Sequence, residues 1–325
     1  MDDLNAKFQV KKEYKIRIDM IRLLIEPTTF EILPMQEGQN PYIDIRQQSH
    51  NAIAKKQFTT LAHVLRKHRI IYTLPVMKKH LPDIVFVANG GLYLPRLRTP
   101  LILLPNMKWP QRKAELPYLE TMYRELGIPI IPYPGKHPFE GQSDLKWFDG
   151  GRKAVCGYGY RATRNTFAEI AALFEKLYGS KNAPELLVLP IASADYYHLD
   201  IAMMEYSSVV GGAVDRCVVH RRAFSPASHR RLAAFLGPKN VEIIDTKDSF
   251  CLNAIVDGSR IITHEMKDPL VAPFLEKCTG REIVQIPMSE YEKSGGSIRC
   301  LVLDLYLTDT ALKPFKVSKD ISRVV

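Results

Sequence analysis

The chain has 325 residues, of which 46% are apolar and 25% are charged, and it is long enough to bury one large core or two ordinary ones. No run approaches the roughly 20 unbroken apolar residues of a membrane span, and the first residues lack the pattern of a signal peptide, so we expect a cytoplasmic protein with no membrane partner. The net charge of +10 allows an anionic partner, but the Lys and Arg are dispersed and form no basic arm, which argues against nucleic acid.

The chain alternates short apolar runs, predicted as strands, with amphipathic runs, predicted as helices. In chain order, the first half is expected to contain a strand at 21–27, a turn at 38–41, a helix at 51–69, a strand at 70–75, two strands at 81–94 that bend at Asn89-Gly90-Gly91, a strand at 100–105, a helix at 111–126 capped by Gly127 and a strand at 128–132. The second half is expected to contain a hairpin at 139–161 turning at Asp149-Gly150, a helix from a capping box at Thr166 to Tyr178, a strand at 185–191, a hairpin at 207–219, a helix at 226–236, a strand at 241–245, a hairpin at 253–263 turning at Asp257-Gly258, a helix at 268–278, and strands at 283–287 and 301–305.

The order strand, hairpin, helix, strand recurs at intervals near 325/5, or about 65 residues. This rhythm indicates a repeated α/β unit, although the units share no obvious sequence identity. No Pro/Ser-rich linker marks a boundary, so we expect one domain at 21–325 after an N-terminal extension at 1–20.

Five cysteines occur at wide spacing: Cys156, Cys217, Cys251, Cys278 and Cys300. None belongs to a C-x-x-C motif or to a cysteine and histidine pair at the spacing of zinc ligands. The sequence therefore predicts neither a disulfide framework nor a metal site.

The segment 157–162 satisfies the dinucleotide pattern G-x-G-x-x-A between a strand and a helix. Its chemistry is unsuitable, because bulky Tyr160 and Arg161 crowd the phosphate turn and the next strand ends without a carboxylate for the ribose. We therefore do not expect a nicotinamide cofactor.

A candidate nucleophile, Cys300, follows the glycine pair Gly295-Gly296, which allows another molecule to approach the backbone closely. Four other side chains could serve a reactive thiol: Glu140 and Asp144 flank a tight turn, and His198 and Asp200 lie in a loop after another strand. Singly, each has a structural explanation, and Cys300 could be a small core residue. Together they supply a thiol, a proton shuttle and carboxylates that can grip a planar guanidinium.

Four motifs in chain order resemble those of the guanidine-modifying superfamily, also called the amidinotransferase or pentein superfamily. They are Phe139-Glu140-Gly141-x-x-Asp144, Gly157-Tyr158-Gly159-x-Arg161-x-Thr163, His198-Leu199-Asp200 and Ser294-Gly295-Gly296-x-x-x-Cys300. The resemblance covers nearly the whole chain and is greatest to the hydrolases, which include arginine dihydrolases, arginine deiminases and dimethylarginine dimethylaminohydrolases.

The resemblance implies a five-bladed α/β propeller with pseudo-fivefold symmetry and no cofactor. It also implies that Cys300 attacks the guanidinium carbon, that His198 moves protons, and that Glu140 and Asp200 bind guanidinium nitrogens. Arg161 matches an arginine that holds the substrate carboxylate in the family. Asp144 and Asn40 match positions near the substrate, the latter more weakly.

The sequence departs from the family pattern at Asn89, where deiminases and dimethylaminohydrolases usually present an aspartate. An asparagine there resembles the dihydrolases, since a neutral contact would hold a ureido intermediate as readily as a guanidinium. Ser297 and Arg299 also replace the commoner glycine and histidine beside the cysteine, which bears on the finer specificity.

The sequence thus predicts a hydrolase of arginine or an arginine derivative, most consistent with a dihydrolase that releases two ammonia molecules. A deiminase, a dimethylaminohydrolase and an amidinotransferase are alternatives on the same fold. A non-catalytic nucleic-acid-binding protein is the alternative from another class. The expected partner is a small guanidino compound, and a homo-oligomer is compatible with the sequence.

Overall fold

The computed structural model describes residues 18–308, apart from 29, 33–39, 45, 66–68, 75–80, 98 and 100. Most of the predicted N-terminal extension and part of the predicted turn at 38–41 lie outside the described residues.

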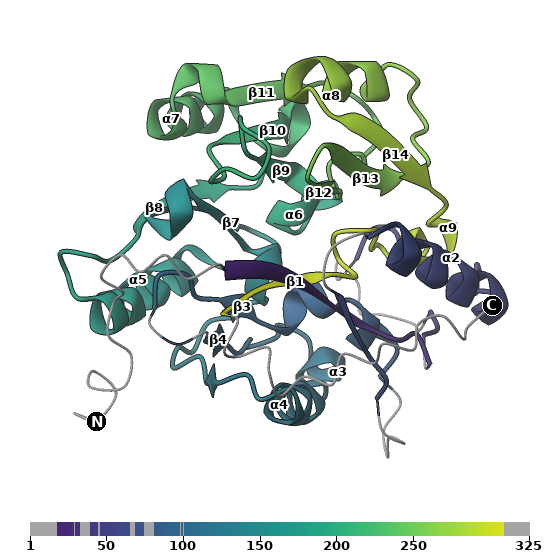
Figure 1. Ribbon diagram of the computed structural model, residues 1–325, viewed down its shortest axis with the longest axis horizontal. Coiled ribbons are helices and arrows are strands. Elements are labelled where there is room, and N and C mark those ends of the chain that lie inside the picture. Colours follow the sequence, from purple (N-terminus) through teal and green to yellow (C-terminus); the bar gives the residue numbers. More distant parts are fainter. Residues whose placement is uncertain are drawn as a thin grey trace.

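The strands of the described residues form five separate sheets of three strands each (Figure 1). In order along each sheet, they are β15 (Leu303–Thr308), β1 (Ile18–Ile25) and β2 (Arg69–Tyr72); β3 (Leu92–Tyr93), β4 (Ile102–Leu103) and β5 (Ile130–Ile131); β6 (Leu145–Phe148), β7 (Lys153–Tyr158) and β8 (Glu185–Pro190); β9 (Met203–Tyr206), β10 (Arg216–His220) and β11 (Val241–Ile244); and β12 (Ile255–Asp257), β13 (Arg260–His264) and β14 (Glu282–Ile286). In every sheet the middle strand pairs antiparallel with one neighbour and parallel with the other.

A parallel pair needs a crossover connection, and each sheet has a helical one. The crossovers are α2 (Asn51–Val64), α3 (Pro110–Lys113) with α4 (Leu116–Glu125), α5 (Arg164–Tyr178), α7 (Pro226–Leu236) and α8 (Val271–Thr279). Figure 1 shows α2, α4, α5, α7 and α8 at the periphery, whereas the short α6 (Leu199–Ala202) lies near the middle.

Five apolar clusters join the sheets in a ring. Residues of the first and second sheets meet in one cluster, and further clusters join the second to the third, the third to the fourth and the fourth to the fifth. A fifth cluster joins the last sheet to the first through Leu24 and Ile262. The sheets themselves stay separate, so side-chain packing between them closes the ring.

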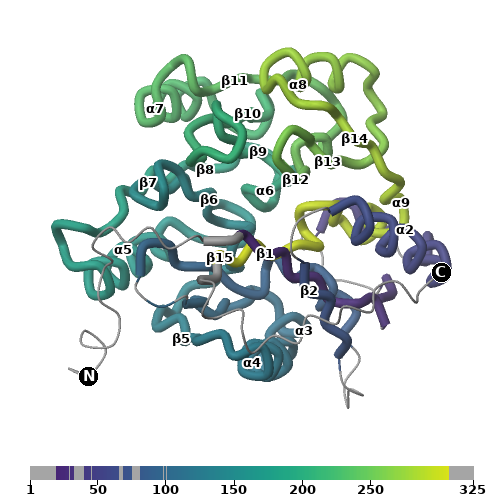
Figure 2. The backbone as a smooth tube through the Cα atoms, in the orientation of Figure 1, coloured from purple at the N-terminus to yellow at the C-terminus, as the bar shows by residue number. Residues whose placement is uncertain are grey.

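One sheet contains strands from both ends of the described chain. Strand β1 pairs antiparallel with β15, with Ile21 opposite Leu305 (Figure 2). This pairing places the segment just before β15, including Cys300, in the interior of the molecule.

The helix α5 illustrates how local sequence sets an element. Its inward face carries Phe167, Ile170 and Phe174 at helical spacing, and all three are buried. Thr163 caps its N-terminus by accepting a hydrogen bond from the Thr166 backbone, an interaction that typically contributes about 1 kcal/mol. The prediction that a capping box begins at Thr166 was therefore wrong by one turn, because the threonine three residues earlier has the extended backbone of a cap.

The largest error of the sequence prediction concerns residues 81–94. Instead of two strands, this stretch contains the 3-10 helices η1 (Pro82–Val85) and η2 (Val87–Gly90), followed by the two-residue strand β3. Both helical turns are buried on every side, and such a short apolar run does not distinguish a strand from a buried helical turn. Pro82 at the first helical position favours the helical alternative.

Other boundaries differ less. The predicted helix at 111–126 is divided into α3 and α4, with Pro117 in the first turn of α4, and the helix predicted at 51–69 ends at Val64. The first strand of the hairpin predicted at 207–219 is β9, which lies earlier at Met203–Tyr206. The hairpins at Asp149-Gly150 and Asp257-Gly258 are confirmed.

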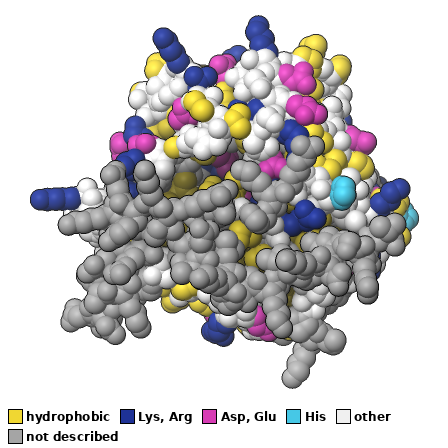
Figure 3. Space-filling model, viewed as in Figure 1, with side chains coloured by type: hydrophobic (Ala, Val, Ile, Leu, Met, Phe, Trp, Pro, Cys, Tyr) yellow, Lys and Arg dark blue, Asp and Glu magenta, His cyan; other side chains and the backbone are white. Residues whose placement is uncertain are grey.

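Among the described residues, no helix is long and apolar enough to cross a membrane. Figure 3 shows Lys and Arg interspersed with Asp and Glu on the visible face, in agreement with the dispersed charge of the sequence.

Candidate active site

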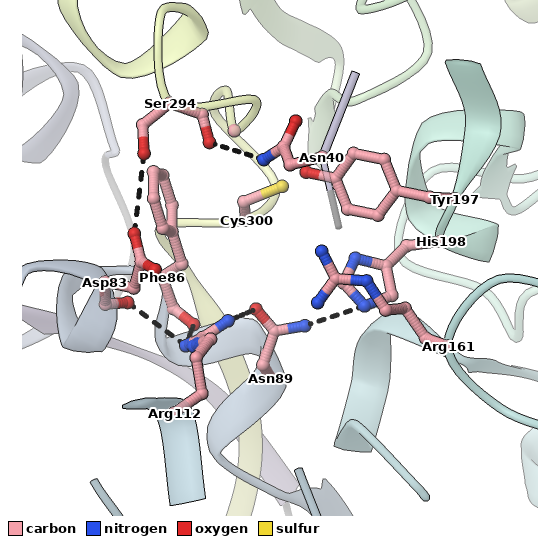
Figure 4. Close-up of a pocket in the computed structure, with 11 residues that line it drawn as sticks. Asn40, Asp83, Phe86, Asn89, Arg112, Arg161, Tyr197, His198, Ser294 and Cys300 are labelled. Carbon is pink, nitrogen blue, oxygen red and sulfur yellow. Dashed lines mark hydrogen bonds between the residues drawn. The ribbon is translucent and has the colours of Figure 1, made fainter. Parts of the chain in front are cut away.

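A pocket lies where the inner segments of several sheets meet, and it contains five of the eight candidate side chains (Figure 4). These five are Cys300, His198, Asn89, Arg161 and Asn40. Cys300 comes from the turn before β15, His198 caps α6, and Asn89 belongs to η2. The glycine-rich segment before Cys300 and the first turn of α6 therefore face each other across one cavity.

The Cys300 thiol is buried and has two polar neighbours of opposite effect. The Asn253 side chain donates a hydrogen bond to Sγ over 3.3 Å, and Asp200 Oδ2 lies 3.9 Å from Sγ. Burial and the negative charge of Asp200 raise the pKa of Cys300 to about 12, although the Asn253 hydrogen bond acts in the other direction. In the free protein, this thiol is therefore protonated at neutral pH.

Asp200 is fully buried behind Cys300 and does not itself line the pocket. Its Oδ2 accepts a hydrogen bond from the Ser143 hydroxyl over 2.9 Å, whereas Oδ1 has no hydrogen-bond partner among the described residues. Leaving a buried carboxylate oxygen unpaired is unfavourable, so this atom is suited to receive an N–H group from a ligand.

His198 and Glu140 form a buried pair, with 2.7 Å between Nε2 and Oε2. The same carboxylate oxygen accepts a hydrogen bond from Arg161 over 3.2 Å, and the other oxygen accepts one from the Lys108 backbone. Burial alone would raise the pKa of Glu140, but Arg161 and His198 outweigh burial and hold that pKa well below its usual value. Burial lowers the pKa of His198, which favours a neutral imidazole that can accept and release a proton.

Arg161 also lies over the ring of Tyr197, with 4.7 Å between the guanidinium carbon and the ring centroid. It therefore makes a cation–π contact as well as its ion pair with Glu140. The guanidinium consequently lies inside the pocket, beside the imidazole (Figure 4).

The orientation of the Asn89 amide is fixed by Arg112. An arginine has only donors, so the Asn89 atom 2.6 Å from Arg112 Nη1 is the oxygen. Arg112 is itself held by both carboxylate oxygens of Glu115, at 2.8 and 2.9 Å. The amide nitrogen of Asn89 consequently faces His198 Nε2 at 3.4 Å. When Nε2 donates its proton to Glu140, it cannot accept a hydrogen bond from Asn89, so the Asn89 N–H has no acceptor in His198. Asn89 thus presents a neutral N–H donor to the pocket.

Two predicted residues have a supporting position. Asp144 does not line the pocket, and its carboxylate accepts a hydrogen bond from the Glu140 backbone over 2.7 Å. Asn40 donates a hydrogen bond to the Ser294 carbonyl and packs against Gly295. Both interactions fix the backbone of segments that carry a candidate catalytic side chain.

The structure adds four residues that the sequence analysis did not single out: Asp83, Arg112, Tyr197 and Asn253. Asp83 accepts a hydrogen bond from the Ser294 hydroxyl over 3.4 Å, and burial raises its pKa. Asp83 and Asn253 each interrupt an otherwise apolar run, which is a usable signal because a buried polar side chain requires specific partners. Among the described residues, no group of three or more His, Cys, Asp or Glu is arranged to hold a metal ion.

Comparisons with known proteins place this chain in the class of the pentein-type guanidino-group hydrolases, which act on C–N bonds. Residues 26–307 match the sequence model of the family described as eukaryotic N,N dimethylarginine dimethylhydrolase. The chain therefore belongs to this family.

Two curated relatives have different activities. The chain is 27% identical over 292 residues to the bifunctional arginine dihydrolase/ornithine cyclodeaminase ArgZ of Synechocystis, a match that covers 88% of this chain but 38% of that protein. It is 26% identical over 276 residues to the N(G),N(G)-dimethylarginine dimethylaminohydrolase of Mycobacterium tuberculosis, with 82% of this chain and 80% of that protein covered. The chain thus spans little more than a third of the length of ArgZ.

The fold is shared with solved structures of the same two kinds. The N-terminal domain of ArgZ covalently bound to a reaction intermediate has a TM-score of 0.74 at 24% identity, over 88% of this chain and 97% of that domain. A dimethylarginine dimethylaminohydrolase adduct with S-methyl-L-thiocitrulline has a TM-score of 0.65 at 16% identity, over 88% of this chain and 99% of that one.

Proposed function

We propose that this protein hydrolyses the guanidino group of arginine or an arginine derivative through a covalent bond to Cys300. The observation that carries the proposal is the thiol beside Asp200, whose second oxygen has no partner among the described residues. A guanidinium placed there would offer N–H donors to Asp200 and its carbon to the sulfur. The cation would also stabilise the thiolate, lowering a pKa that is about 12 in the free protein.

In the first step, His198 takes the proton of the Cys300 thiol, the thiolate attacks the guanidinium carbon, and a C–N bond breaks. His198 protonates the nitrogen that leaves as ammonia, and the product is an S-alkylthiouronium on Cys300. His198 then takes a proton from water, which attacks the same carbon. The C–S bond breaks, the thiol is restored, and a ureido group remains on the substrate.

Glu140 and Arg161 serve substrate binding in this proposal. Glu140 orients His198 and binds a guanidinium nitrogen. Arg161 is 3.2 Å from Glu140 in the free protein and would move to the substrate carboxylate, a planar partner that suits a guanidinium fork. Asp144 and Asn40 position the backbone around these groups.

Asn89 supports a second hydrolysis, which would make the protein a dihydrolase. Its amide N–H faces the pocket because Arg112 holds the oxygen. Such a donor can bind the carbonyl oxygen of a ureido group, which a carboxylate would repel. Hydrolysis of the retained ureido compound then yields an ornithine-type amine, carbon dioxide and a second ammonia.

The test is incubation with L-arginine and quantification of ammonia, ornithine and citrulline. We expect two ammonia per ornithine and little citrulline. Asn89→Asp should release citrulline with one ammonia, because the donor to the ureido oxygen is lost. Cys300→Ser should be inactive, and full activity of that variant on every guanidino substrate tried would refute the mechanism.

Hydrolysis of N,N-dimethylarginine is a second candidate function, favoured by the family match over residues 26–307. Dimethylamine release in the same assay distinguishes it. An amidinotransferase would instead pass the amidino group to an added amine. Salt-sensitive oligonucleotide binding without turnover of any guanidine would favour the non-catalytic alternative.

We further propose that the five sheets are the blades of one five-bladed propeller within a single domain at 21–325. The ring of five apolar clusters supports this arrangement. A cytoplasmic location and a homo-oligomeric state remain predictions from the sequence.

A further inference from the structure

A second and larger pocket, of about 630 Å³, lies on the other side of the segment that carries Cys300. Its described lining comes from β3, β6, β9, β15 and the turn η4 (Asp149–Gly151), with side chains from neighbouring loops. Arg299 lines this pocket, whereas the adjacent Cys300 lines the first one. The volume lies within the range of small-molecule sites.

The lining of this pocket has a positive balance of charge. Its described residues include four cationic side chains and two carboxylates, so the difference is 4 − 2 = +2. The cations are Arg96, Lys146, Arg152 and Arg299, and the carboxylates are Glu205 and Asp304. Both carboxylates already pair with Arg299, at 3.8 Å from Glu205 and 2.9 Å from Asp304.

Lys146 provides donors that the protein leaves available. Its side chain is 1% exposed, and Nζ contacts the two carboxylate oxygens of Glu205 over 3.3 and 3.4 Å. An ammonium has three N–H donors, and one carboxylate at this distance satisfies them poorly. Burial lowers the pKa of Lys146, although Glu205 counteracts this effect.

Aromatic rings supply an apolar wall beside these charges. Tyr93 and Tyr306 lie 5.2 Å apart between ring centroids, and Trp147 donates an indole hydrogen bond to the Tyr93 carbonyl over 2.9 Å. The wall is therefore held rigidly, and it offers a surface for the carbon skeleton of a ligand.

We propose that this pocket binds a small organic anion, whose carboxylate or phosphate group contacts Lys146 and Arg299 at the floor while Arg96 and Arg152 attract it at the rim. The proposal is independent of the reaction at Cys300. An anion would satisfy the spare donors of Lys146 and balance the excess positive charge, which a neutral or cationic ligand would not do.

Trp147 provides a built-in reporter, because the chain has two tryptophans and Trp109→Phe leaves Trp147 alone. In that variant we would compare quenching of fluorescence by iodide, by caesium and by neutral acrylamide. A cationic pocket concentrates iodide, so its quenching constant should exceed that of caesium several-fold. Citrate is the carboxylate probe and pyrophosphate is the phosphate probe. For each, we would compare the protection of Trp147 fluorescence against iodide quenching with that given by sodium chloride at equal ionic strength.

Protection by citrate, by pyrophosphate or by both beyond that of chloride is the expected result, and the stronger probe identifies the preferred group. A double variant, Arg96→Gln with Arg152→Gln, changes an exposed and a half-buried residue and leaves Lys146 and Arg299 in place. It should reduce the preference for iodide over caesium and weaken the protection of Trp147 about tenfold. Lys146→Met should abolish protection if the variant folds. Equal quenching by iodide and caesium, or protection no greater than that of chloride, would overturn the proposal whatever the outcome of the arginine assay.

Discussion

The charge of Cys300 depends on two side chains that act in opposite directions. Asp200 disfavours the thiolate, whereas the Asn253 amide donates a hydrogen bond to the sulfur and favours it. Asn253 also accepts hydrogen bonds from the backbone N–H groups of Arg299 and Cys300. One buried amide therefore positions the Cys300 backbone and favours the charged form of its thiol.

Asp200→Asn should make the free thiol more reactive but the enzyme less active. Removing the negative charge lowers the pKa of Cys300, and each unit of decrease raises the thiolate fraction at pH 8 about tenfold. The same change removes the charged acceptor that we propose for the substrate, which we expect to lower kcat/KM about 10- to 100-fold. The measurements are the rate of iodoacetamide alkylation against pH and the kinetics with arginine.

Asn253→Asp is the matched control, because it adds a negative charge beside the thiol where Asp200→Asn removes one. It keeps an acceptor for the two backbone N–H groups but replaces the donor with a negative charge, so alkylation should become slower. If both variants changed the alkylation rate in the same direction, the opposing roles of Asp200 and Asn253 would be wrong.

At the residue scale, the sequence could predict side chains that belong to a motif. Cys300, His198, Asn89 and Arg161 were predicted in this way and line one pocket. The place of Asn253 in an apolar run signals a buried polar side chain, but its contact with Cys300 could not be predicted, because its partners lie on segments far away in the chain and only the folded structure brings them together.

The segment between α9 (Ser289–Glu292) and Cys300 is held by close contacts at its glycines. Gly295 has φ +79°, in the left-handed region, and an added Cβ would clash with the Asn40 side chain. The Gly295 carbonyl accepts a hydrogen bond from the Tyr197 hydroxyl over 2.5 Å. The backbone here is therefore pressed between two sides of the pocket.

Gly295→Ala should lower activity at least tenfold and destabilise the fold by about 2 kcal/mol, because strain and a clash act together. Gly280→Ala is the matched control: it has φ +67°, but nothing lies within 4 Å of the added Cβ. That variant should lose about 1 kcal/mol and keep its activity. Thermal unfolding and kcat for both variants test the difference, and an equal loss of activity would contradict it.

The same segment is anchored by His264 in β13. Its imidazole contacts Asp248 over 3.0 Å through Nε2 and Glu292 over 2.6 Å through Nδ1. Burial would lower the pKa of His264, but the two carboxylates outweigh burial and raise it to about 9. The imidazole is therefore charged at neutral pH and joins β13 to α9.

Because the folded pKa of His264 lies above its value of 6.5 in the unfolded chain, its stabilising contribution is complete below about pH 6.5 and is lost as pH rises through 9. The shift corresponds to about 3 kcal/mol. We expect the free energy of unfolding of the wild type to fall between pH 6.5 and 10, and that of His264→Gln to fall by less. Chemical denaturation at a series of pH values measures the free energy of unfolding of both proteins. An equal decrease for the wild type and for His264→Gln would rule out this role of His264.

At the element scale, sequence prediction succeeded where a local rule determines the structure. The Asp-Gly turns specify two hairpins, and the predicted Gly127 ends α4. It failed at residues 81–94, where burial on every side removes the alternation that identifies a strand.

Arg22 in β1 connects the sheet that contains β1 and β15 to the sheet that contains β12. Its side chain is 1% exposed, it pairs with Asp257 of β12 at 2.8 Å, and it donates a hydrogen bond to the Val256 carbonyl over 2.8 Å. A further contact with Asp304 of β15 spans 3.6 Å. One buried cation thus connects strands from the beginning, the late part and the end of the described chain.

Arg22→Ala should reduce the free energy of unfolding by about 3 kcal/mol, because it removes one partner from a buried ion pair. Arg46→Ala is the control, since Arg46 is 86% exposed and its ion pair with Asp44 should contribute less than about 1 kcal/mol. Denaturant titration of both variants is the measurement. Equal destabilisation would mean that burial does not determine the strength of these pairs.

At the scale of the whole molecule, the interval of about 65 residues predicted five similar units, and five sheets of one connectivity are found. The pairing of β1 with β15 was not predicted from the strand pattern. No local signal distinguishes a strand that pairs with its neighbour in sequence from one that pairs with the other end of the chain.

The pairing of β1 with β15 also sets the order in which the protein can mature during synthesis. The first strand of this sheet leaves the ribosome early, but its partner follows the residues of the other four sheets. Contacts so distant in sequence form slowly, since a long loop must close first. Cys300 lies three residues before the start of β15, so a nascent chain carries His198 and Glu140 well before it carries this cysteine. The pocket can therefore be completed only after the last described strand has been made.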